Sequence, residues 1–170
     1  MTTLFDQTIP QFSKMLGNLD AWLGAAVALA EQKKFSPDVI ANSRLAADMF
    51  TLIQQVQSAC DAAKYAGAYM SGTTPPSHPD TETTMVELRA RIATVRAHLE
   101  TVTRESCAGA EERKVSPPWL HGAWLTGADY ITQVAIPNFY FHVVTAYDIL
   151  RHNGVALGKQ AFIGAMPVHT

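Results

Sequence analysis

Apolar residues recur at helical spacing along most of the chain. In the first long segment they run from Phe5 to Ala30, in steps that alternate between four and three residues. This spacing predicts an amphipathic helix that buries one face. Because proline is tolerated only near the start of a helix, Pro10 places the regular part of this helix from about Thr8 onward.

A second long helix is expected after a break near Asn42–Ser43. Its apolar positions run from Leu45 to Met70 at the same spacing, which again predicts one buried face. The other face carries polar residues, namely Gln54, Gln57, Asp61 and Lys64. The segment Ser71–Thr83 that follows contains three prolines and no apolar residue, so it is predicted to be a surface loop.

A third helix is predicted from its apolar residues, which run from Met85 to Val102. Thr84 and Glu87 have the spacing of a capping box at its start. The next residues, Thr103–Thr126, lack helical periodicity. They form an excursion before the last helix.

The sequence "VSPPWLHGAW" in this excursion predicts a small hairpin that turns at His121–Gly122. Trp119 and Trp124 flank the turn. They either cover the end of the bundle or form the wall of a pocket, and a cover is the simpler interpretation.

The fourth helix is predicted from about Gly127 to His152, before an Asn-Gly pair that is typical of helix C-termini. After it, Phe162 and Ile163 are expected to pack back on the bundle. Four amphipathic helices joined by connections of unequal length predict an all-α protein. We expect a four-helix bundle formed by a single domain over residues 1–170.

Polar residues interrupt the apolar face of the fourth helix. Steps of three and four residues link the positions on this face, which are Ile131, Ala135, Asn138, His142, Thr145 and Ile149. Asn138 and His142 are therefore predicted to point into the bundle, one turn apart. Pro137 lacks the backbone donor for the Gln133 carbonyl, so a kink beside this pair is expected to open space there.

The second helix is predicted to carry a matching pair, because Asp48 and Gln55 fall on or near its apolar face. A buried amide or carboxylate without a partner is unfavourable. We therefore expect Asp48 and Gln55 to face Asn138 and His142 across the bundle. His142 alone is most simply a core histidine with satisfied hydrogen bonds, whereas a cluster of four polar residues indicates a pocket or binding site.

Composition and charge exclude several classes of protein. Of the 170 residues, 48% are hydrophobic and 16% are charged, which describes a globular chain. The net charge is −2 with His neutral, and without a basic stripe on a helix the sequence does not support nucleic-acid binding. No segment stays apolar over the ~18 residues of a membrane span, and the N-terminus lacks a signal-peptide pattern. Cys60 and Cys107 are too few for a disulfide scaffold or a zinc knuckle, so a reduced, cytoplasmic protein is the simplest interpretation.

Four segments carry a family resemblance: "LDAWLGAA", "RLAADMFTLIQQVQSACDAAK", "PNFYFHVVTAYDILRHNGVALGK" and "AFIGA". With the long excursion before the last helix, they make the chain similar to the DinB/YfiT-like superfamily of bacterial four-helix bundles. They resemble one branch in particular, which is described only as a domain of unknown function. The resemblance covers nearly the whole chain and rests mainly on the second and fourth helices.

Members of the superfamily that are similar to this chain bind a divalent metal through three histidines. The resemblance places Gln55 on the histidine position of the second helix, and Asn138 and His142 on the H-x-x-x-H of the last helix. Amide oxygens are weak ligands for Zn²⁺ or Ni²⁺, which prefer imidazole and thiolate. The resemblance therefore implies a pocket with a degenerate site for a weakly bound divalent metal, even if Asp48 assists.

Two functions of different classes follow from these residues. In the first, which we favour, the pocket binds a small molecule without catalysis. In the second, the protein resembles relatives that act as thiol-dependent transferases or isomerases, in which a metal activates a thiol. His142 would then be the ligand or general base, Gln55 and Asn138 would orient the substrate, and Asp48 would fix the histidine tautomer. The resemblance also makes a homodimer an expected form.

Overall fold

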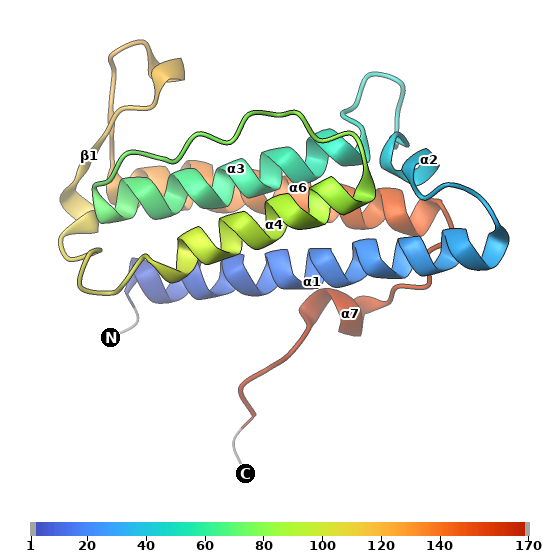
Figure 1. Ribbon diagram of the computed structural model, residues 1–170. Helices are drawn as coiled ribbons and strands as arrows, with labels where there is room; N and C mark the ends of the chain where they lie inside the picture. The colour runs from blue at the N-terminus through green and yellow to red at the C-terminus, as the bar shows by residue number, and fades with distance from the viewer. Residues whose placement is uncertain (1–2, 169–170) are drawn as a thin grey trace.

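The protein is described by a computed structural model that covers residues 3–168. Four long helices lie side by side and enclose the core (Figure 1). They are α1 (Leu4–Lys33), α3 (Leu52–Ser71), α4 (Met85–Glu100) and α6 (Ile136–His152). The predicted four-helix bundle is confirmed.

The first helix begins earlier than the sequence predicts. Thr3 caps it, because its side chain accepts a hydrogen bond from the Asp6 amide while the Asp6 carboxylate accepts one from the Thr3 amide. This capping box holds the first turn, so α1 starts at Leu4 and includes Pro10 within its length. The expectation that regular helix begins near Thr8 is wrong, because capping outweighs the one backbone hydrogen bond that Pro10 removes.

The second long helix begins later than the sequence predicts. After the short α2 (Asp38–Ala41), the chain is irregular until Thr51, which forms a capping box with Gln54 at the start of α3. The Leu52 amide donates to the Ser43 carbonyl at 2.9 Å, which folds this irregular segment back on itself. The predicted helical apolar positions before Leu52 are therefore wrong.

Residues 72–84, which we call the strap, connect α3 to α4 and run back along both helices (green in Figure 1). At the end of the strap, Thr84 and Glu87 form the predicted capping box of α4. The strap is a surface loop, as predicted, but it also covers charged side chains that the sequence analysis placed on the polar face of the second helix.

The excursion before the last helix contains the predicted hairpin. Strands β1 (Lys114–Val115) and β2 (Leu125–Thr126) pair in antiparallel fashion. The connection between them contains a 3-10 turn, η2 (Pro118–Leu120), and another, η1 (Ala110–Glu112), precedes β1. His121 has φ 49° and Gly122 has φ 93°, so the chain turns where the sequence predicts, through the left-handed region that favours glycine.

The last helix is continuous from residue 127 to residue 152, as predicted. It consists of α5 (Gly127–Asp129), a π-helical segment η3 (Tyr130–Ala135) and α6. The π-helical segment lies immediately before Pro137. Proline cannot donate to the carbonyl four residues earlier, so a wide turn at this position relieves the mismatch.

The C-terminal segment packs on α1 through the short α7 (Lys159–Ile163). The Trp22 indole donates to the Ala161 carbonyl at 3.1 Å, and the rings of Trp22 and Phe162 stack with centroids 5.5 Å apart. The predicted packing of Phe162 is confirmed, whereas Ile163 stays 40% exposed. Within residues 3–168, no helix combines the length and the apolarity that a membrane span requires.

Candidate ligand-binding cavity

Gln55 of α3 and His142 of α6 form a buried polar pair, as the sequence predicts. Gln55 Oε1 and His142 Nδ1 lie 2.7 Å apart, and the two residues are 1% and 9% exposed. The amide nitrogen of Gln55 points to the Phe50 carbonyl at 3.5 Å, which orients the amide oxygen toward the imidazole. Because Oε1 can only accept, Nδ1 carries the proton and Nε2 keeps a lone pair.

Two aromatic rings flank His142. The Phe50 ring is nearly parallel to the imidazole, with centroids 6.4 Å apart, and the Phe141 ring meets it edge-on at 5.2 Å. Burial of the ring lowers the pKa of His142, because it disfavours the charged imidazolium. The ring is therefore neutral near pH 7.

The pKa of His142 makes stability depend on pH. We expect NMR titration to give His142 a pKa below the usual 6.5. The contribution of the neutral ring to the free energy of unfolding is therefore present above about pH 6.5 and lost as the pH falls. In Gln55→Glu, a carboxylate accepts the Nδ1 proton, and the pKa of His142 should rise. A pKa of 6.5 or above in the wild type, or no rise in the variant, would contradict the buried pair.

Removing the acceptor of this pair should destabilise the fold. Gln55→Leu leaves the Nδ1 proton of His142 without its partner, so we expect the free energy of unfolding to fall by about 1–3 kcal/mol. Urea denaturation measures the change. Gln133→Leu serves as a control because Gln133 is exposed on the final helix, which carries His142, and its effect should stay within about 0.5 kcal/mol. Equal effects of the two substitutions would show that the pair is unimportant for stability.

Asn138 was predicted to point into the core, and this prediction is wrong. It is exposed, and the neighbouring Phe139 is fully buried instead. The π-helical segment explains this shift, because its wider turn moves the buried face of α6 forward by one residue. The core face now passes through Phe139 and Val143, which leaves His142 at its edge.

The predicted position of Asp48, on or near the apolar face of the second helix, is also wrong. Asp48 lies in the irregular segment before α3 and is exposed. The expected pairing of Asp48 with His142 across the bundle is therefore wrong. Only Gln55 and His142, of the four predicted residues, meet in the interior.

A cavity of about 440 Å³ opens between α3 and the last helix, beside His142. This volume lies within the range of small-molecule sites. Polar groups, aromatic rings and two small apolar side chains line it, namely Ser58, Asp61, Ala62, Tyr65, Trp119, Tyr130, Val134, Asn138 and His142. Asn138 thus borders the same cavity as His142, although it does so from the surface. Trp119 reaches it from the excursion, so this residue forms a pocket wall and not the simple cover that was expected.

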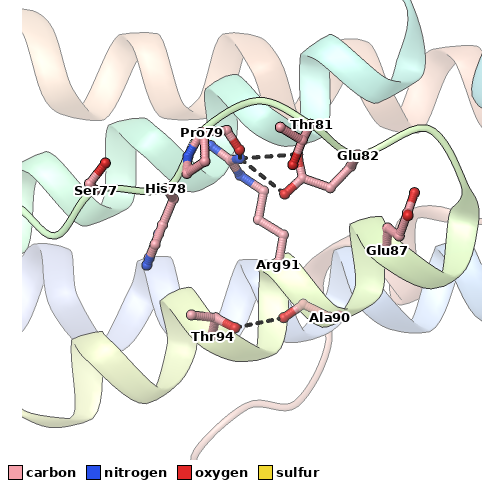
Figure 2. A pocket seen from close by; sticks show the side chains of 9 residues that line it. All are labelled: Ser77, His78, Pro79, Thr81, Glu82, Glu87, Ala90, Arg91 and Thr94. Atoms are coloured by element: carbon pink, nitrogen blue, oxygen red, sulfur yellow. Dashed lines mark hydrogen bonds and ion pairs between the residues drawn. The ribbon is translucent and has the colours of Figure 1, made fainter.

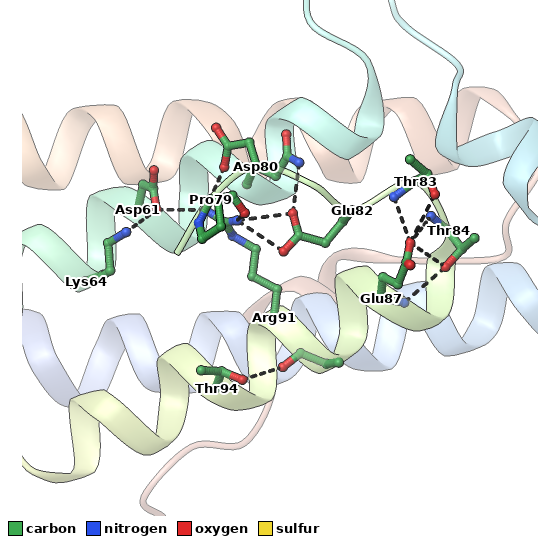
Figure 3. Close-up of polar contacts among 12 residues, drawn as sticks. Asp61, Lys64, Pro79, Asp80, Glu82, Thr83, Thr84, Glu87, Arg91 and Thr94 are labelled. Carbon is green, nitrogen blue, oxygen red and sulfur yellow. Dashed lines mark hydrogen bonds and ion pairs between the residues drawn. The ribbon is translucent and has the colours of Figure 1, made fainter. Parts of the chain in front are cut away.

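A network of charged side chains connects α3, α4 and the strap (Figure 3). The guanidinium of Arg91, from α4, bonds to Asp61 at 2.8 Å, Asp80 at 2.9 Å and Glu82 at 3.1 Å. Lys64 Nζ binds Asp61 Oδ1 at 2.7 Å. The side chains of Arg91 and Lys64 are each only 2% exposed. The network therefore fixes Asp61 at the edge of the cavity.

This network is not predicted by the sequence pattern. The helical spacing places Asp61 and Lys64 on the polar face of the second helix, which the strap covers in the structure. The composition of the strap is the one sequence feature that indicates such a network. The strap contains Asp80 and Glu82 and no apolar residue, so it could cover a helix only through polar contacts such as those to Arg91.

A second hollow, of about 340 Å³, lies between the strap and α4 (Figure 2). His78 and Arg91 border it, and Nδ1 of the first and Nε of the second are buried without a hydrogen-bond partner among the described residues. The remaining nitrogens of Arg91 already bind carboxylates and the Pro79 carbonyl. Its guanidinium charge is thus compensated within the protein.

The side chains beside His142 do not fit the three-imidazole metal site that the superfamily implies. The Gln55 oxygen already accepts the proton of His142 Nδ1, and Asn138 offers only a neutral amide at the surface. Among the described residues, no group of three His, Cys, Asp or Glu side chains is placed to hold an ion. A weak Zn²⁺ or Ni²⁺ site on Gln55, Asn138 and His142 stays a prediction that this donor set does not favour.

The fold, with its hairpin before a long final helix, defines a DinB-like helical bundle. A crystal structure of a DinB family member protein from Shewanella denitrificans is similar to the chain with a TM-score of 0.94 and 51% sequence identity. The similarity covers 98% of this chain and 95% of that chain. The family model DUF1993, a domain of unknown function, matches residues 4–163, so the chain belongs to this family. Among curated proteins, no sequence matches it.

Proposed function

We propose that the protein binds a small organic molecule in the cavity between α3 and the last helix. The hydrogen bond from His142 to Gln55 is the observation that carries this proposal. It holds the imidazole in one tautomer and one orientation, so Nε2 acts as a fixed acceptor beside the cavity. A core histidine needs only satisfied hydrogen bonds, whereas here a rigid acceptor lies next to a space of ligand size.

The lining of the cavity also supports binding. Tyr65, Trp119 and Tyr130 provide aromatic surface, and Ser58 and Asn138 add groups that donate and accept hydrogen bonds. Ligand sites combine an apolar wall with a few polar groups that set orientation. The cavity beside His142 has both.

Metal-assisted thiol transfer, the alternative function, has less support. It needs a metal that activates a thiol as thiolate, and the donor set beside His142 suits such an ion poorly. The protein's own thiols are not activated as thiolates either, because burial raises the pKa of Cys60 to about 12 and also raises the pKa of Cys107. A screen of small electrophiles with common thiols tests this function, since metal-dependent turnover that His142→Ala abolishes would favour it over simple binding.

A fragment library tests the proposed binding. We expect hits in ligand-observed NMR, and a hit at ten times its Kd should stabilise the fold by about 1.4 kcal/mol. Asn138→Trp fills the cavity from an exposed position and should abolish these hits, whereas Gln133→Trp, at an exposed position outside the cavity, should retain them. A library without hits, or hits that persist in Asn138→Trp, would contradict the proposal.

Self-association stays a prediction from the family resemblance. Light scattering coupled to size-exclusion chromatography measures the mass in solution. A homodimer gives twice the chain mass of 18.5 kDa, and the mass of a single chain would contradict it.

A further inference from the structure

We propose that the cavity beside His142 selects molecules with an ammonium group, which Asp61 binds. This inference rests on the proposed function, because it names the chemical class of the ligand for the same cavity. Its first support is the set of hydrogen bonds by which the charged network holds the Asp61 carboxylate. Its second support is the hydrogen-bonding capacity of the other groups that line the cavity.

The carboxylate of Asp61 has one oxygen committed and one free. Lys64 Nζ and Arg91 Nη2 both donate to Oδ1, at 2.7 and 2.8 Å. Oδ2 has no hydrogen-bond partner within residues 3–168 of the structure. Asp61 lines the cavity and its side chain is 28% exposed. A ligand can therefore reach this carboxylate without displacing the buried cations.

The network that contains Asp61 carries more negative than positive charge, although both of its cations contact Asp61. Two cationic side chains, Lys64 and Arg91, bind three carboxylates, those of Asp61, Asp80 and Glu82. The cluster thus carries one net negative charge at neutral pH. Carboxylates that are not fully compensated attract cations more strongly at a partly buried site than in open water.

The imidazole of His142, which also lines the cavity, requires a donor as well. Gln55 holds the proton of His142 on Nδ1, so Nε2 can only accept a hydrogen bond while the ring is neutral. A carboxylate or phosphate would place its lone pairs against Nε2 and against Asp61 Oδ2. An ammonium group provides up to three donors, so it can donate to either acceptor.

The aromatic rings of the cavity also favour an organic cation. Trp119 and Tyr130 line the cavity together with Asp61, and aromatic faces attract organic cations. Lys64 Nζ already lies 4.8 Å from the centroid of the Tyr65 ring, so the rings of Trp119 and Tyr130 remain for the ligand. The expected ligand is therefore an amine with an apolar or aromatic body.

Three probes of nearly equal size test the charge preference on the wild-type protein. They are 2-phenylethylamine, 2-phenylethanol and 3-phenylpropanoate, which present an ammonium, a hydroxyl and a carboxylate group. NMR titration at neutral pH should show the amine binding about tenfold or more tightly than the alcohol, and the carboxylate binding most weakly. Equal or tighter binding of the alcohol or the carboxylate would overturn the ammonium proposal and leave the proposed function standing. Absence of binding by all three would also overturn it. The proposed function itself fails only if the fragment library yields no hits, or hits that persist in Asn138→Trp.

A matched pair of variants tests the role of Asp61. Asp61→Asn keeps a carbonyl oxygen for Lys64 and Arg91 but replaces the free acceptor with a donor, so it should weaken amine binding about tenfold or more. Asp80→Asn removes the same charge from the same network outside the cavity, and it should change amine binding less than about threefold. Equal losses in the two variants would assign the effect to overall charge and overturn the role of Asp61. If Asp61→Asn fails to fold, the three-probe comparison on the wild type still decides the proposal.

Discussion

Arg91→Met should lower the free energy of unfolding by about 3 kcal/mol, because it removes the cation that binds one carboxylate of α3 and two of the strap. Arg91 is only 4% exposed, and Glu82 loses the Nη1 donor that lies 3.1 Å from both of its oxygens. The carboxylates of Asp61 and Asp80 are 28% and 58% exposed. Water can therefore solvate them in the variant, which keeps the loss near the lower end of the range for broken buried pairs.

Arg89→Met provides the control for this substitution. Arg89 lies on the same helix and pairs with Asp20 at 2.7 Å, but both side chains are substantially exposed. Exposed ion pairs contribute about 0–1 kcal/mol, so urea denaturation should separate the two variants clearly. Similar losses in Arg89→Met and Arg91→Met would show that the charged network around Arg91 has no special structural role.

Phe139→Ala should lower the free energy of unfolding by about 3–5 kcal/mol, the range for removing a large buried aromatic side chain. Phe139 is fully buried, and its ring stacks on Phe12 of α1 with centroids 4.1 Å apart. The substitution therefore leaves a cavity at the contact between the first and last helices. Denaturant unfolding of the variant measures this loss.

Phe141→Ala is the matched control, since Phe141 lies two residues further along α6 and is 57% exposed. Its effect should stay below about 1 kcal/mol. The pair of variants also tests the register of the last helix. A small effect at Phe139 would contradict the shift of the buried face that we attribute to the π-helical segment.

The helices could be predicted from the sequence because their apolar stripes are long and regular. The ends of the helices were less predictable. The capping boxes of α1 and α3, at Thr3 and Thr51, decide where these helices begin, and apolar periodicity carries no information about caps. The start of α4 was predicted correctly because the spacing of Thr84 and Glu87 is itself that of a capping box.

The candidate site could be predicted only in part. Gln55 and His142 were found because their spacing places them on buried faces, and a buried amide needs a partner. Asn138 was misplaced because a π-helical turn changes the register without a clear sequence signal beyond Pro137. The role of Asp61 could not be predicted, since it depends on Arg91 and on a strap that is distant in sequence.

The most direct test of the account is the tautomer of His142, measured by long-range ¹H–¹⁵N correlation on protein with ¹⁵N-labelled histidine. His142→Asn assigns the signal among the six histidines of the chain. We expect a neutral ring at pH 7.5 with its proton on Nδ1, and an Nε2 resonance that shifts when a fragment that binds the cavity, or 2-phenylethylamine, is added. A proton on Nε2, or an Nε2 resonance that no bound molecule shifts, would contradict a cavity in which His142 is the fixed acceptor.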